Sequence, residues 1–192
     1  MSVNLSKGQR ISLEKRGGGT LTQVRMGLGW DAIKKRGLFA KRTQEIDLDA
    51  SCLVFNAGGQ RTDEVWFQQL RAKSGAIIHT GDNRTGAGDG DDESIIVDLQ
   101  ALPADAHTLV FVVNSYTGQD FSQIENAYCR LIDSSSEQEI ARYELTGSGR
   151  HTAQVMAKVT CDGPAWTMTA IGAIANGRTF QDLEPIARQH LG

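Results

Sequence analysis

The 192-residue sequence has only three prolines, few aromatic residues and no long apolar run. So little proline leaves no proline-rich linker, and we expect one domain over residues 1–192. The apolar runs are far shorter than a membrane span, and residues 1–15 lack the apolar core of a signal peptide. These absences predict a cytoplasmic protein that is not an integral membrane protein. Peripheral attachment to the inner face of the membrane remains an open alternative.

Cysteine and histidine are equally sparse. Cys52, Cys129 and Cys161 are widely spaced without a CxxC pair, so we expect reduced, buried residues within strands rather than a redox or zinc role. The four histidines are scattered without HExxH spacing, and no GxSxG motif occurs, which argues against zinc and serine hydrolases. A net charge of −3 provides no general attraction for nucleic acid, and we expect no nucleic-acid partner.

Short runs of alternating or β-branched residues recur between Gly, Asp and Asn residues. Alternation with a period of two is typical of a strand with one buried face. With almost no helical periodicity between them, these runs predict an all-β sandwich of two sheets. The predicted strands are 10–14, 21–28, 45–55, 63–67, 75–80, 93–99, 107–115, 126–133, 138–145, 152–160 and 165–173.

Helical signals are confined to two short segments. Residues 179–190 place Phe180, Leu183 and Ile186 on one face, with Thr179 or Asp182 as the cap. Pro185 fits such a helix only if it lies in the first turn. Residues 120–126 predict a second short helix.

The segment Asp82–Glu93 holds five acidic residues and one basic residue, a net charge of −4, so the rest of the chain carries about +1. Folding brings these carboxylates together, and their repulsion favours binding of a divalent cation. The acids and Asn83 supply hard oxygen ligands, and Gly86, Gly88 and Gly90, together with Gly81 just before the segment, free the backbone to curl around an ion. We therefore expect calcium at this loop, with carboxylates from Asp82, Asp89, Asp91, Asp92 and Glu93.

Neither familiar calcium motif matches this loop. An EF-hand would need oxygens and a glycine where Arg84, Gly86 and Ala87 stand, and the flanking segments predict strands. The GAGDGDD run resembles a calcium β-helix repeat but occurs only once, and one repeat cannot form a solenoid.

Three further acids are candidate ligands. Asp47 and Asp49 share one face of a predicted strand and could complete a cation site, and Asp31 follows GLGW. Each of these would otherwise lie on an ordinary solvated strand face or turn. His79, two residues before the loop, is expected to be a strand-end residue, with support of the metal ligands as the alternative.

Other functions stay open at this stage. The acidic cluster could serve a metal-dependent phosphoesterase or a nucleotide or small-ligand binder, or it could dock on a basic partner. The basic stretch 34–42 predicts a solvated loop, and the alternative is an electrostatic handle for an anionic membrane or an acidic partner.

The motifs themselves resemble the TerD/TerZ family of bacterial tellurite-resistance proteins, over nearly the whole chain and most closely its TerZ-type members. They are GLGWD (27–31), DLDAS (47–51), HTGDNRTGAGDGDDE (79–93), VVNSYTGQDFSQIENAYCRLID (112–133), EIARYEL (139–145) and AIGAIANGRT (170–179).

This resemblance implies a calcium-binding, non-enzymatic β-sandwich of the tellurite-resistance and general stress response, with two ions per chain. It also implies that the protein acts with other tellurium-resistance proteins, including a membrane-associated component. The implied ligands are drawn from Asp82, Asn83, Asp89, Asp91, Asp92 and Glu93, assisted by Asp47 and Asp49, with Asp31 as a further candidate. The basic stretch 34–42 varies among relatives, so the resemblance assigns it no role.

Overall fold

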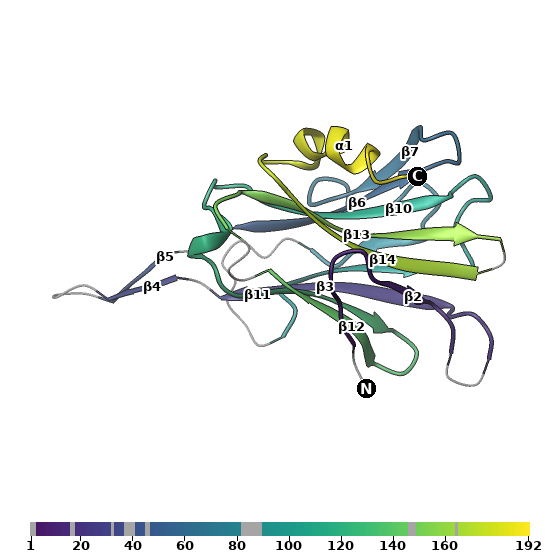
Figure 1. The fold of residues 1–192 in the computed structure, drawn as a ribbon, viewed down its shortest axis with the longest axis horizontal. Coiled ribbons are helices and arrows are strands. Elements are labelled where there is room, and N and C mark those ends of the chain that lie inside the picture. Colours follow the sequence, from purple (N-terminus) through teal and green to yellow (C-terminus); the bar gives the residue numbers. More distant parts are fainter. Residues whose placement is uncertain are drawn as a thin grey trace.

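The computed structural model describes residues 3–15, 18–31, 33–36, 41–44, 47–81, 90–145, 149–163 and 165–192. Most of these residues are in strands. Twelve of the strands form two six-stranded sheets, which pack face to face (Figure 1). The predicted all-β sandwich is therefore confirmed, and a strand lies within or overlaps each of the eleven predicted ranges.

The first sheet has the strand order β1-β12-β11-β3-β9-β8. Its pairs are antiparallel except for β1 and β12, which run parallel. The strands are β1 (Val3–Asn4), β3 (Gln23–Asp31), β8 (Ile77–His79), β9 (Glu93–Asp98), β11 (Glu125–Asp133) and β12 (Gln138–Glu144).

The second sheet has the strand order β2-β14-β13-β10-β6-β7 and is antiparallel throughout. The strands are β2 (Arg10–Ser12), β6 (Leu48–Phe55), β7 (Arg61–Val65), β10 (Thr108–Ser115), β13 (Ala153–Asp162) and β14 (Ala165–Ala175).

Two apolar clusters fix these layers. The larger lies between the sheets and includes Trp30, Leu48 and Val97. The smaller lies on the other face of the second sheet, where Phe55 and Val110 pack beneath the helix α1 (Phe180–Arg188). Strands buried on both faces lose the alternation seen on a half-exposed strand, as in β6 and β10, which have no exposed residue.

The helix α1 matches its predicted position but contradicts one expectation. Thr179 is its N-cap and Asp182 closes the capping box, as the sequence indicates. Pro185, however, is the sixth helical residue rather than a first-turn residue. The packing of Phe180, Leu183 and Ala187 on the sheet holds the helix together despite the missing N–H group.

Two smaller expectations also need correction. Residues 120–126 form only a single 3₁₀ turn, Phe121–Gln123, because Glu125 already belongs to β11. Cys52 and Cys129 are buried as expected, whereas Cys161 is only half-buried near the end of β13.

The described parts of the basic stretch, 34–36 and 41–42, are strand rather than the predicted loop, and residues 37–40 lie outside the described residues. Ile33–Arg36 (β4) and Lys41–Gln44 (β5) pair antiparallel as a two-stranded ribbon, and Figure 1 shows it projecting from the sandwich. Hairpin pairing satisfies backbone N–H and C=O groups that a loop would leave to water. Charge alone therefore did not decide between loop and ribbon.

Candidate metal centre

Acidic residues from both sheets meet at one end of the sandwich. Asp31 ends β3, Glu93 begins β9, and Asp47 and Asp49 flank the start of β6. Antiparallel pairing of β3 with β9 places Leu28 opposite Glu93, so the end of one strand lies beside the start of the other. The sheet register therefore gathers residues that are far apart in the sequence.

Glu93 links the two sheets at this end. Its side chain is almost completely buried, and Oε2 accepts a hydrogen bond from the backbone N–H of Ala50 at 2.8 Å. A buried carboxylate is costly unless it is hydrogen-bonded or bound to a cation. Glu93 is therefore held in place in the interior by a strand of the opposite sheet.

His79 supports the position of Glu93. The N–H of Gly81 donates to Nδ1 of His79 at 3.1 Å, so the ring proton belongs on Nε2. From there it faces the carbonyl oxygen of Ala50 at 3.2 Å and Oε2 of Glu93 at 3.4 Å. The predicted strand-end position is confirmed, and the ring lies where it orients a candidate ligand rather than acting as one.

Asp92 lies beside Asp31 at the end of β3. Its Oδ2 accepts from the N–H of Trp30 at 2.9 Å, and its own N–H donates to the carbonyl of Leu28 at 2.8 Å. Burial raises the pKa of Asp92, the Trp30 hydrogen bond opposes this rise, and Asp31, Glu93 and Asp91 add to it. Several carboxylates therefore contribute to the negative electrostatic potential around Asp92.

Asp49 and Asn114 form the next part of this end. Both are buried, and Nδ2 of Asn114 donates to Oδ2 of Asp49 at 3.0 Å and to the carbonyl of Arg178 at 2.6 Å. The amide oxygen of Asn114 is buried and accepts no hydrogen bond within the described residues. Sequence reasoning missed Asn114, although a polar residue near the end of the apolar run 109–113 was a usable signal.

Asp91 points away from these groups. Its Oδ1 accepts from Nε of Arg130 at 2.7 Å and lies 3.3 Å from the hydroxyl of Tyr128. The carboxylate lies over Gly27, where a Cβ atom would overlap it. Arg130 and Tyr128 are on the outer face of the first sheet, because their strand neighbours Cys129 and Leu131 face the core.

The predicted ligands thus fall into three groups. Asp31, Asp92 and Glu93 lie at one strand junction, Asp47 and Asp49 lie on the adjoining strand, and Asp91 is engaged by Arg130. Asp82, Asn83 and Asp89 are outside the described residues. Across the ranges that the structure covers, no three ligating side chains are close enough to hold a metal by themselves. Asp47 and Asp49 are buried rather than on a solvated face.

The TerD domain family model matches residues 1–190. The chain belongs to this family. It is 44% identical to the tellurium resistance protein TerZ of Serratia marcescens, over 94% of each chain. It is also 38% identical to the stress response protein SCP2 of Bacillus subtilis, over 95% of this chain and 98% of that one. A crystal structure of a TerD homologue from Streptomyces coelicolor covers 90% of this chain and 98% of its own, with a TM-score of 0.70 at 18% identity.

The donor set of this TerD domain suits a hard cation. Carboxylate, amide and carbonyl oxygens are the ligands that calcium prefers, and no cysteine lies among them. The unsatisfied amide oxygen of Asn114 and the carboxylates around Asp92 fit an ion bound at this end. Asp31 is tied to Asn126, whose Nδ2 donates to its Oδ2 at 2.5 Å.

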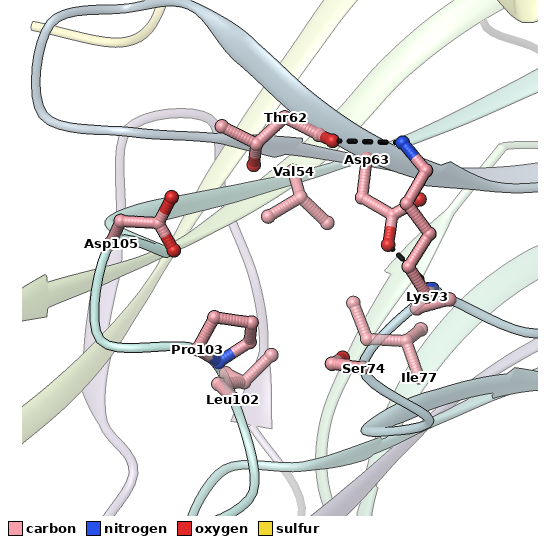
Figure 2. A pocket seen from close by; sticks show the side chains of 10 residues that line it. Val54, Thr62, Asp63, Lys73, Ser74, Ile77, Leu102, Pro103 and Asp105 are labelled. Atoms are coloured by element: carbon pink, nitrogen blue, oxygen red, sulfur yellow. Dashed lines mark hydrogen bonds between the residues drawn. The ribbon is translucent and has the colours of Figure 1, made fainter.

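A cavity at the opposite end of the sandwich does not offer a comparable site. It has a volume of about 170 Å³, and its lining includes Val54 near the end of β6 and Leu102, which follows β9. Figure 2 shows the side chains around it, Asp63 and Lys73 among them. Asp63 lines it, but its oxygens accept from the N–H groups of Glu64 at 3.0 Å and Lys73 at 2.7 Å and from the side-chain amide of Gln69 at 3.1 Å. These bonds hold the β7 segment together, and the carboxylate is committed to the fold.

No helix among the residues described here has the length and apolar content that crossing a membrane requires.

Proposed function

We propose that this TerD-domain protein is a non-enzymatic calcium-binding component of the tellurium-resistance and stress response. Calcium, at two ions per chain, orders the acidic segment 82–93 and an adjoining interaction surface. The observation that carries this proposal is the convergence of Asp31, Asp92 and Glu93 at one strand junction, beside Asp47 and Asp49. The names of the relatives, which describe resistance and stress proteins, support the assignment to this response.

The physical basis is electrostatic. Burial raises the pKa of Asp92, and the neighbouring carboxylates add to this rise because like charges disfavour its ionisation. A bound divalent cation would replace that repulsion with coordination, so calcium binding and folding stability would be linked. Glu93, Asp92, Asp49 and Asp47 are the described residues best placed to contribute ligands, with His79 orienting Glu93.

The partners are part of the same proposal. We place the protein in the cytoplasm, acting with other tellurium-resistance proteins in a complex that includes a membrane-associated member. The calcium-ordered end would form the contact surface, since the basic ribbon β4–β5 leaves β3 directly after Asp31. The ribbon then returns toward Asp47, so its base lies beside the acidic junction.

Calorimetric titration of chelator-treated protein with calcium and with magnesium tests this proposal. We expect saturable calcium binding at two ions per chain, weaker magnesium binding, and a thermal midpoint that rises by several degrees in excess calcium. No heat of binding and an unchanged midpoint in millimolar calcium would overturn it. Metal-dependent turnover of phosphate esters would instead assign the cluster to a phosphoesterase.

Matched variants locate the binding. Asp92→Asn and Glu93→Gln keep an oxygen acceptor for Trp30 and Ala50 but remove a charge, and each should weaken calcium binding about tenfold or more. Asp98→Asn is the control, because Asp98 is at the other end of β9 and caps the turn at Gln100. It should bind calcium like the parent protein.

A further inference from the structure

A basic pocket lies on the helix-side face of the second sheet, beside the end of α1. It has a volume of about 290 Å³, and its charged lining residues are Lys7, Arg10 and Lys158, together with His190. Among the described residues that line it, none is an aspartate or a glutamate. Three cationic side chains around one concave site favour an anionic ligand.

The sheet register builds this pocket. Arg10 on β2 is directly opposite Thr169 on β14, and Thr169 is directly opposite Lys158 on β13. Directly opposed residues share a face, so these three side chains form a row across three neighbouring strands. Adjacent strands are about 4.8 Å apart, which places the two cationic residues roughly 10 Å from each other with a hydroxyl between them.

The apolar cluster beneath α1 shows on which face of the second sheet this row of side chains lies. Val110 is opposite Lys158 on the next strand and belongs to the apolar cluster beneath α1. The row therefore continues the surface on which the helix packs. The helix ends at Arg188, and Gln189 and His190 then form one wall of the pocket.

Lys158 is the anchor of the site. Its side chain is only 6% exposed, and Nζ donates to the carbonyl of His190 at 2.7 Å and to the oxygen of Gly192 at 3.3 Å. An ammonium group has three donors, so one remains for a ligand. Burial lowers the pKa of Lys158, and Arg10 adds to this effect while Asp162 opposes it. Burial also lowers the pKa of His190, as do Lys7 and Lys158.

We propose that this pocket binds the phosphoryl group of a small phosphorylated molecule or inorganic phosphate. Arg10 would supply the planar, multiple-donor contact, Lys158 the buried charge, and Thr169 a hydroxyl between them. Lys7 and His190 also line the pocket. The volume suits a small ligand, since it is at the lower end of the range for small-molecule sites. The proposal does not depend on calcium binding at the acidic end.

The test is an NMR titration of the full chain, without added calcium, with inorganic phosphate and with adenosine monophosphate at constant ionic strength. We expect saturable shifts at Arg10, Thr169 and Lys158 for at least one of the two probes. Tighter binding of the nucleotide would identify an organic phosphate, and equal binding would identify the free oxyanion. No saturable shift with either probe in the millimolar range would overturn the proposal.

Arg10→Gln is the decisive variant, because Arg10 is exposed on an edge strand and its loss leaves the core intact. It should reduce affinity about tenfold. Arg71→Gln changes the same charge at another exposed position and should bind like the parent. An equal loss in both variants would show a general charge effect and would overturn the assigned site.

Discussion

At the residue scale, the acidic segment is divided where the chain enters β9, because Asp91 precedes the strand and Glu93 begins it. Glu93 faces the interior, where it contacts the opposite sheet, whereas Asp91 lies on the outer face against Arg130. Two residues that look equivalent in the sequence therefore have different neighbours. Asp91 forms an ion pair with Arg130 of the first sheet, and this contact does not require a metal.

Gly27 is the position that tests this arrangement. A Cβ atom there would overlap the carboxylate of Asp91, so Gly27→Ala should destabilise the protein by about 1–3 kcal/mol. Asp91→Ala removes the obstacle and the Arg130 ion pair together. In the double variant we expect a loss smaller than the sum of the two single losses, measured by urea unfolding. Additive losses would contradict the predicted overlap.

The cysteines should differ in reactivity. Burial raises the pKa of Cys129 to about 12 and raises that of Cys52 still further, and both side chains are almost inaccessible. Cys161 is half-buried and donates to the carbonyl of Gly163 at 3.2 Å. Native protein treated with iodoacetamide should be alkylated first at Cys161, as read by peptide mass spectrometry. Early alkylation of Cys52 would contradict the core packing.

His151 should make stability depend on pH. Burial lowers its pKa below 6.5, an effect that Gln154 and Asp120 partly oppose, and the ring packs against Phe121 at 4.9 Å between centroids. The unfolded chain then takes up a proton at a higher pH than the folded chain. Stability should therefore fall as pH drops below about 6.5, by about 1.4 kcal/mol for each unit of pKa difference. His151→Phe should flatten this slope in urea unfolding, and an unchanged slope would refute the assignment.

At the scale of elements, the helix α1 depends on its first turn. Oδ2 of Asp182 accepts from the N–H groups of Arg178 at 2.8 Å and Thr179 at 3.3 Å. Asp182→Ala should cost about 0.5–2 kcal/mol, because these donors lose their partner. Gln181→Ala, at an exposed neighbouring position, is the control and should leave the thermal midpoint nearly unchanged. An equal effect of the two changes would exclude the cap as the cause.

The basic ribbon shows the limit of charge patterns at this scale. A run of positive charge in a sequence predicts solvation equally well for a loop and for a hairpin. Only the pairing of Ile33 with Gln44 and of Arg36 with Lys41 distinguishes the two.

At the scale of the whole molecule, the two sheets share one core. Trp30 in the first sheet and Trp166 in the second belong to the same apolar cluster. We therefore expect one cooperative unfolding transition, as a single domain requires. Variants that retain only Trp30 or only Trp166 should give coincident urea midpoints by fluorescence, after correction for any change in stability. Separate midpoints would mean that the sheets unfold independently.

Much of the architecture could be predicted from local patterns. Runs of alternating or β-branched residues located every long strand, and the capping residues located α1. Short elements were harder: β1 has only two residues, and the turn at Phe121 is too brief for a helical period to develop. The candidate site was only partly predictable, because Asn114 joins Asp49 through strand pairing between residues 65 positions apart.

The sequence by itself determined the fold class, the positions of the long strands and the charge of the acidic segment, since each depends on neighbours along the chain. The tertiary structure decided which carboxylates meet, that Asp91 faces Arg130, and that Arg10 and Lys158 share one pocket. Those outcomes depend on sheet order and register. A shift of the strand register by one residue moves each side chain to the other face of the sheet. The pairing of strands that are distant in the sequence leaves no trace in the local composition.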